Sequence, residues 1–396
     1  MFGNRATGAL VDILDTDTQR GPWEHKAFVP APLPAESPEL SPRTYRVVAN
    51  ARAAIAALDS TARQLPNPTL LRQPTLRREA QSTSALEGTY APLGEVLTAD
   101  NDEPPTQDMR EILNYVTIAD QAFRWVDDER PVSLSLLCGL QGRLVRRTPA
   151  DTDGAGDVRK IQVVIGRRSD AKPGDTPVEA ARFVPSPPGD DLRARVSDLV
   201  DWMRVDRSDE IDPVVAAAMS HYQFETLHPF EDGNGRIGRL LVVVYLYGHG
   251  ILSEPTLTVS PWFEARRTEY YDRLLAVSCN GEWDRWIEFF AQGIRESADQ
   301  TRRQMLALVQ VQEELKEEVR ASKLRADSAQ LLVDYAVANV SFTVRGVQRD
   351  LALSYGRANG LVNQLVTLEI LRPLNQSGYN RRFFAPRVFD TLIQSA

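Results

Sequence analysis

Apolar residues recur at three- and four-residue steps along most of the chain, which is the spacing of one face of an α-helix. Residues 44–64 show this spacing first, with Val47, Ala51 and Ile55 on one face. The pattern therefore predicts a mainly α protein. Further helices with the same spacing are expected over 105–126, 133–146, 189–205, 212–227, 235–250, 264–278 and 283–318.

The N-terminal region is less regular. A short helix is expected from about Leu76 to Leu86, because Pro74 fits the first turn of a helix. Before it, residues 1–42 are rich in proline and acidic residues, as in VPAPLPAESPELSP at 29–42. This segment is therefore expected to be extended or loosely packed, without a helix.

β-Branched and apolar residues gather without helical spacing at 158–185. The run VRKIQVVIG is followed by turns that contain glycine and proline, and then by ARFVPSPP. This composition predicts two short strands that form a hairpin or flap just before a helix.

The last segment, 321–396, changes pattern again. It reads as helix, turn, helix, turn and helix, after which RPLNQSGYNRRFFAP predicts two strands around a polar turn. Three helices and such a wing make a winged helix-turn-helix domain. Its candidate recognition helix is about Tyr355–Leu368. The side chains of this helix and wing that are suited to nucleic acid are Arg357, Asn359, Asn363, Gln364, Arg381 and Arg382.

Composition narrows the class of protein. The 396 residues suffice for two or three domains, and 42% apolar and 25% charged residues are ordinary for a soluble globular protein. The net charge of −8 argues against a general nucleic-acid binder, and 321–396, with nine Lys/Arg and five Asp/Glu, is only modestly basic at +4. Cys138 and Cys279 form neither a disulfide framework nor a metal-ligand spacing. No signal peptide or membrane-length apolar run is visible, so a cytoplasmic setting is expected.

The stretch HPFEDGNGRIGR, residues 228–239, concentrates groups that bind phosphate. The Gly-Asn-Gly turn at 233–235 tolerates positive φ, so its backbone N–H groups can form an anion nest. A helix that starts at about Gly235 adds its N-terminal dipole, and Arg236 and Arg239 lie on one face of it. The stretch therefore predicts a cradle for a polyphosphate.

Three other side chains of this stretch suggest its chemistry. Asp232 precedes the turn, and a single carboxylate beside phosphates is typical of a Mg²⁺ site, since Mg²⁺ keeps several of its waters. Asn234 could orient a phosphate oxygen. His228 ends the preceding helix and can act as an unprotonated general base at neutral pH. The Walker spacing with its lysine is absent, so the reaction class that fits is attack of a hydroxyl on a nucleotide phosphate.

The same stretch resembles the core motif of Fic domains, H-P-F-x-[DE]-G-N-G-R-x-x-R, at every fixed position. RKIQVVIG and ARFVPSPP resemble the flap region and the proline-rich segment of that family, and AAAMSHYQFETLHPF resembles the helix that delivers the histidine. The resemblance implies a helical Fic core with a short β-hairpin flap. The expected domains are an N-terminal region with a regulatory helix, the Fic core, a linker helix and the winged helix, over 1–104, 105–300, 301–320 and 321–396.

The resemblance also implies an activity, the transfer of AMP from ATP–Mg²⁺ to a Ser, Thr or Tyr hydroxyl of a protein target or of the chain itself. His228 would deprotonate that hydroxyl, and Asp232 would hold Mg²⁺ between the α- and β-phosphates. Doc-type relatives, which phosphorylate, carry a lysine at the position of Gly235, so nucleotidyl transfer is favoured here. The nucleotide-binding loop, with Phe230 as its anchor in the core, would comprise Phe230, Gly233, Asn234, Gly235, Arg236 and Arg239. Strand pairing with a target would use the flap residues Val163, Val164, Ile165 and Gly166.

A second stretch, STSALEGTY at 82–90, resembles the inhibitory motif [ST]-x-x-x-E-[GN] of regulated Fic proteins, as Thr83, Glu87 and Gly88. In that family the glutamate pairs with the second arginine of the core motif, here Arg239. ATP would still bind, but with its α-phosphate misaligned for attack. In some relatives this glutamate also supports removal of AMP from the target, so a brake and a deAMPylase both remain open.

Two classes of function follow. The first is an autoinhibited protein adenylyltransferase, and the second is a DNA-binding regulator whose Fic core senses nucleotide. The presence of His228 favours the first, and the winged helix is equally suited to DNA or to docking. Tyr270 and Tyr271 follow the core motif and are expected mainly in core packing. A homodimer through the Fic core is also expected.

Overall fold

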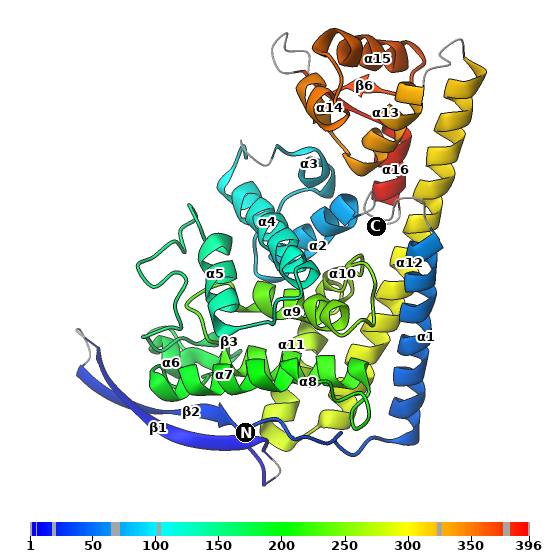
Figure 1. Cartoon of the computed structure of the whole chain (residues 1–396). Coiled ribbons are helices and arrows are strands. Elements are labelled where there is room, and N and C mark those ends of the chain that lie inside the picture. Colours follow the sequence, from blue (N-terminus) through cyan, green and yellow to red (C-terminus); the bar gives the residue numbers. More distant parts are fainter. Residues whose placement is uncertain are drawn as a thin grey trace. The chain divides into compact units, whose positions relative to one another are not determined.

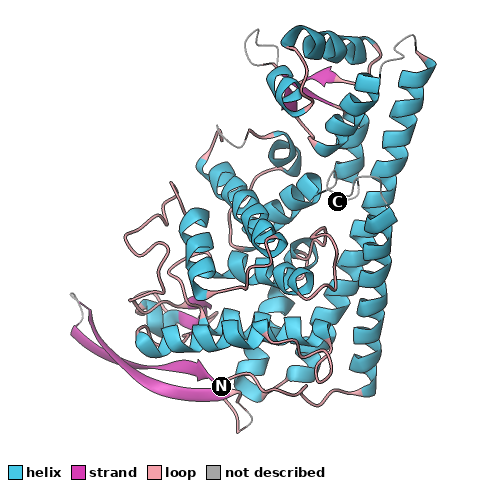
Figure 2. Ribbon diagram, in the orientation of Figure 1, coloured by secondary structure: helices cyan, strands magenta, loops and turns pink. Residues whose placement is uncertain are grey.

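The structure, a computed structural model, describes residues 2–4, 6–17, 21–64, 72–100, 104–322, 327–374 and 381–394 (Figure 1). Helices dominate, which confirms the mainly α prediction (Figure 2). Two compact units alternate along the sequence. Unit 1 comprises Met1–Ala53, Thr117–Ile251 and Trp262–Arg295, and unit 2 comprises Ala54–Val116, Leu252–Pro261 and Glu296–Ala396. Within the described residues, no helix is both long and apolar enough to cross a membrane.

Unit 1 is built around α8 (Pro213–Leu227) and α9 (Asn234–Gly248), which pack against each other. Asp212 caps α8 by accepting a hydrogen bond from the backbone N–H of Val214, and Pro213 occupies the first turn. Every residue of α8 except Glu225 is buried, so this helix is apolar on nearly all sides. The other helices that lie wholly in unit 1 are α5 (Leu134–Leu144), α6 (Pro177–Ala180), α7 (Asp190–Arg204) and α11 (Arg267–Asn280).

Four helices contribute residues to both units. They agree with the predicted helices to within a few residues, except for α10, which the sequence did not predict. They are α1 (Pro42–Gln64), α4 (Gln107–Asp127), α10 (Ser260–Glu264) and α12 (Trp283–Ala321).

The N-terminal segment differs from its prediction. It forms an antiparallel hairpin of β1 (Gly8–Asp17) and β2 (Gly21–Pro30) instead of a loosely packed stretch. Ile13 and Ala27 of this hairpin are buried in a small apolar cluster. The alternating run ALVDI supplies the inward-facing residues, and the proline-rich part begins only where the hairpin ends.

The predicted flap is present as two short strands, β3 (Ile165–Arg167) and β4 (Ala181–Phe183), paired antiparallel with Ile165 opposite Phe183. Its base completes the apolar cluster of the N-terminal hairpin through Val178, Ala181 and Val184. The flap is therefore anchored on one side by a segment more than 130 residues away in sequence.

Unit 2 contains α2 (Arg72–Leu86), which starts two residues before Pro74, and a short α3 (Leu93–Thr98) that the sequence did not predict.

The C-terminal part of unit 2, residues 327–374 and 381–394, is called the C-terminal module here. The candidate recognition helix is α15 (Tyr355–Thr367), and the sheet has the strand order β5-β7-β6. The turn of the predicted wing, 375–380, lies outside the described residues. The module's other elements are α13 (Asp327–Ala338), β5 (Phe342–Thr343), α14 (Val344–Asp350), β6 (Arg372–Pro373), β7 (Arg382–Phe384) and α16 (Pro386–Gln394), the last of which was not predicted.

Candidate active site

The loop between α8 and α9 has the shape that an anion-binding turn requires. His228 ends α8 in the left-handed region, with φ 50°, and its N–H donates to Phe224 O at 3.0 Å. Gly233 precedes α9, also in the left-handed region with φ 84°. A Cβ on Gly233 would lie 2.8 Å from Cδ2 of Leu144, so both the backbone angle and the space require glycine. The backbone N–H groups of the first turn of α9 have no partner within the helix itself and are therefore suited to an anion.

Asn234 stabilises this loop internally. Its Oδ1 accepts from the N–H of Phe230 at 2.8 Å, and its Nδ2 donates to the carbonyl of the same residue at 2.8 Å. The Phe230 side chain is fully buried beside Phe224. The Asn234 amide thus bonds to the loop backbone, and its expected contact with a phosphate oxygen stays a prediction.

The two arginines of the loop lie on α9 and are buried, with 3% of Arg236 and 0% of Arg239 exposed. Arg236 donates to Oδ1 of Asp232 at 2.6 Å, across one turn, while the Asp232 side chain is half exposed. Burial of a guanidinium is costly unless an anion or several acceptors lie beside it. Asp232 is such an anion for Arg236, and a phosphate bound at this loop would be a second one.

The His228 ring is only partly buried, and its Nδ1 lies 3.3 Å from the carbonyl oxygen of Glu225. A carbonyl can only accept a hydrogen bond, so in the neutral ring Nδ1 carries the proton and Nε2 carries the lone pair. In this tautomer Nε2 has the lone pair that a general base requires.

Arg159 holds the backbone at His228, and sequence reasoning assigned it no role. Its Nε donates to His228 O at 2.8 Å, its backbone N–H donates to Pro229 O at 2.9 Å, and its Nη2 contacts Ser186 O. Only 1% of the residue is exposed, and burial lowers its pKa to about 10, so it stays charged at neutral pH. The available signal was a charged residue two positions before the run IQVVIG.

A second histidine of α8 packs into the core. Nδ1 of His221 lies 3.0 Å from Gly238 O on α9, and Nε2 lies 2.7 Å from the hydroxyl of Tyr270. The ring is buried among aromatic side chains, including Phe263 and Trp286. Burial lowers its pKa to about 3, so it is neutral at physiological pH and joins α8 to α9. Tyr270 is a core residue, as expected.

The loop also offers a carboxylate suited to a cation. Among the described residues there is no group of three or more His, Cys, Asp or Glu side chains suited to a metal. Glu231 instead accepts from Thr152 Oγ1 at 3.1 Å. Asp232 alone fits a Mg²⁺ ion whose other ligands are phosphate oxygens and water, because Mg²⁺ usually binds few protein groups.

The residues that resemble an inhibitory motif lie at the end of α2. Thr83 is fully buried, Glu87 is exposed in the turn that follows the helix, and Gly88 continues that turn with φ 96°. Gly88 thus has the left-handed geometry of a residue just past a helix end. Because Glu87 belongs to unit 2 and Arg239 to unit 1, their pairing stays a prediction.

The flap residues occupy different positions. Val164 packs against the apolar cluster at the flap base, and Ile165 and Gly166 lie on β3, the edge strand of a two-stranded sheet. Val163 is partly buried and precedes the strand. An open strand edge is suited to pairing with an extended peptide, so target docking at β3 also stays a prediction.

Two parts of the chain, one of which includes this loop, match models of a known protein family. Residues 131–246 match the Fic/DOC family, and residues 45–124 match the Fic/DOC family N-terminal region. The chain is 29% identical over 176 residues to protein adenylyltransferase fic-1 of Caenorhabditis elegans, covering 42% of this chain and 31% of the relative. It is 30% identical over 144 residues to protein adenylyltransferase Fic of Culex quinquefasciatus, covering 36% and 24%. The matched part is thus less than a third of either relative.

A solved structure has a similar fold. A Fic family protein from Desulfovibrio desulfuricans G20 superposes with a TM-score of 0.54 at 21% identity, over 88% of this chain and 98% of that one. At this identity the likeness concerns the fold. Together, the two family matches and the named relatives support a Fic-domain protein.

Proposed function

We propose that this protein transfers AMP from ATP to a hydroxyl group of a protein target. The observation that carries the proposal is the loop between α8 and α9, where a half-buried histidine, a left-handed glycine turn and two buried arginines lie within 12 residues, 228–239. The names of the two relatives, both protein adenylyltransferases, support the same reaction.

The chain's own groups divide the work of holding the nucleotide. The first-turn N–H groups of α9 and its dipole would bind phosphate oxygens, and Arg236 and Arg239 would neutralise the remaining charge. Asp232 would hold Mg²⁺, which supplies charge compensation for the phosphates when bound. Because Asp232 already pairs with Arg236, cation binding would loosen this ion pair.

The base would be Nε2 of His228. It takes the proton of the target hydroxyl while that oxygen bonds to the α-phosphorus of ATP, and the bond from this phosphorus to the bridging oxygen breaks, so pyrophosphate leaves. Arg159 acts through the backbone of His228 and Pro229 and is a positioning residue.

We further propose that Glu87 inhibits this reaction by pairing with Arg239. A buried guanidinium binds either a carboxylate or a terminal phosphate well, and the two compete for the same donors. A nucleotide displaced by about 1 Å reacts about 10²-fold more slowly. Support for reversal of the modification by the same glutamate comes only from the family resemblance, so it is the second candidate.

The transferred group and the inhibition are tested together. Wild type, Glu87→Gly and Tyr90→Ala are incubated with cell lysate, Mg²⁺, and ATP labelled at either the α- or the γ-phosphate. Tyr90 is exposed in the same turn and serves as the matched control. We expect α-label on protein with Glu87→Gly, about 10²-fold above wild type and Tyr90→Ala. Label from the γ-position would indicate a kinase instead, and equal activity of all three variants would contradict the inhibitory role.

A further inference from the structure

Glu87 lies in the turn of a short helical hairpin within unit 2. Helix α2 ends at Leu86, α3 begins at Leu93, and the two helices pack against each other. Arg77 of α2 donates to the carbonyl oxygen of Val96 of α3 at 2.5 Å, which fixes the two arms of the hairpin. Burial lowers the pKa of Arg77 to about 10, so this donor stays charged at neutral pH. Residues 72–100 are called the inhibitory hairpin below.

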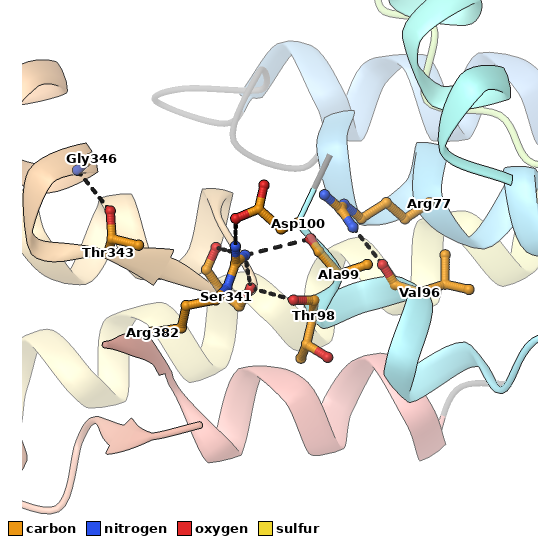
Figure 3. A network of polar contacts seen from close by, with 9 residues as sticks. All are labelled: Arg77, Val96, Thr98, Ala99, Asp100, Ser341, Thr343, Gly346 and Arg382. Atoms are coloured by element: carbon orange, nitrogen blue, oxygen red, sulfur yellow. Dashed lines mark hydrogen bonds and ion pairs between the residues drawn. The ribbon is translucent and has the colours of Figure 1, made fainter. Parts of the chain in front are cut away.

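The far end of the inhibitory hairpin is held by the C-terminal module (Figure 3). Arg382 of β7 pairs with Asp100 at 2.5 Å and donates to Ala99 O at 3.4 Å. The same guanidinium donates to Oγ of Ser341 at 2.5 Å, and Ser341 donates in turn to Thr98 O at 2.8 Å. Three successive residues, 98–100, are therefore bound by two side chains of the module.

These contacts bear on the expected role of Arg381 and Arg382, the two arginines of the predicted wing. Only 16% of the Arg382 side chain is exposed, and its N–H groups bind Asp100, Ala99 and Ser341 of the same unit. Arg381, next to it, is exposed and lies over the ring of Phe383. The expectation that both arginines contact nucleic acid is thus corrected for Arg382, whose described contacts favour a docking role for the module.

A second contact joins the same parts. Helix α16 packs on α3, and a Cβ added to Gly94 would lie 3.0 Å from Cζ of Phe389. Arg387 of α16 pairs with Glu314 and Glu318 of α12, the latter at 2.5 Å. The module is therefore fixed on α12 and on α3 at once, so a shift of the module is transmitted to α3.

We propose that the C-terminal module controls inhibition by holding the end of the inhibitory hairpin through Arg382 and Ser341. This inference rests on the proposed inhibition by Glu87. Residues 88–92 connect Glu87 to α3, and the contact of Arg77 with Val96 joins α2 to α3, so movement of α3 is passed to the turn that holds Glu87. The contacts of Arg382 and Ser341 with residues 98–100 are called the junction below. Release of residues 98–100 would free Glu87 from its inhibitory position, and a partner that binds the module could regulate transfer through this junction.

The test compares variants of the 396-residue chain in one assay of AMP transfer to lysate proteins. Arg382→Ala removes the junction, and Arg381→Ala is the matched control one residue away. Glu87→Gly gives the fully released rate, and Glu87→Gly/Arg382→Ala shows whether both act through the same element. Amide hydrogen exchange of residues 82–100 is followed in each variant.

We expect Arg382→Ala to raise transfer roughly fivefold or more above wild type and to speed amide exchange at 82–100, whereas Arg381→Ala changes neither. In the Glu87→Gly background, Arg382→Ala should add nothing. The exchanged pair Arg382→Asp/Asp100→Arg should bring transfer back towards the wild-type rate, which a general loss of folding would not allow.

The outcomes separate the two proposals. If Glu87→Gly is active but Arg382→Ala transfers at the wild-type rate, control by the module is wrong and the proposed function stands. If Arg382→Ala speeds exchange at 82–100 but no variant labels any protein, the proposed function fails. An additive effect of Arg382→Ala in the Glu87→Gly background would also overturn the proposal, because the module would then act elsewhere.

Discussion

At the scale of single residues, the loop geometry depends on a side chain far away in sequence. Arg159 is 69 residues from His228, yet its guanidinium and backbone bind the carbonyls of His228 and Pro229. Arg159→Lys keeps the charge but loses the planar fork that reaches several carbonyls. In the Glu87→Gly background we expect kcat to fall about tenfold or more while KM for ATP changes little, because the base is misplaced and the phosphate groups are not.

Steady-state kinetics of this variant are measured beside Lys160→Ala. Lys160 is adjacent, with 84% of its side chain exposed, and serves as the control. Unchanged kcat in Arg159→Lys would show that Arg159 has no positioning role. A rise in KM alone would indicate a nucleotide-binding role instead.

At the scale of elements, the contact between α8 and α9 includes a histidine that stays neutral. The pKa of His221 is about 3 in the folded chain, below its ordinary value of 6.5, because the ring is buried. Between pH 6.5 and 3 the unfolded chain therefore takes up a proton that the folded chain does not. The corresponding stability is present above pH 6.5 and is lost as the pH falls through this window.

Urea unfolding of wild type and His221→Gln from pH 7.5 to 4 measures this effect. We expect the unfolding free energy of wild type to fall more steeply below pH 6.5, by up to about 1.4 kcal/mol per pH unit. The other acidic groups contribute to both proteins alike, so they cancel in the comparison. Parallel curves would show that His221 takes up its proton alike in the folded and unfolded chains, so that folding does not lower its pKa.

The elements also show what the sequence can and cannot predict. Long helices such as α8 and α12 follow from periodicity, because a continuous apolar face extends over many turns. The short α3 and α16 were missed because they span only 6 and 9 residues, too few for a clear helical period, and they are held by tertiary contacts such as that of Gly94 with Phe389. The candidate loop at 228–239 could be predicted because its residues are contiguous, whereas Arg159 and the contacts of Arg382 depend on the tertiary structure.

At the scale of the whole molecule, the two compact units cut across the sequential order of the predicted domains, whose boundaries remain predictions. Unit 2 combines the inhibitory motif with the C-terminal module, and the described contacts at Arg382 and α16 lie within this unit. A sequence prediction placed these two regions in separate domains. Their close association is what makes regulation through the module testable. A cytoplasmic location, a homodimer and DNA binding by the module remain predictions.

The central claim is that the loop at 228–239 transfers AMP to protein with His228 as the base. The most direct measurement is the transfer of α-label from ATP–Mg²⁺ to proteins of a cell lysate, comparing Glu87→Gly with Glu87→Gly/His228→Ala. We predict labelled protein with the first and none with the second, at equal folded content by circular dichroism. Equal labelling by both variants, or no labelled protein with either, would contradict the account.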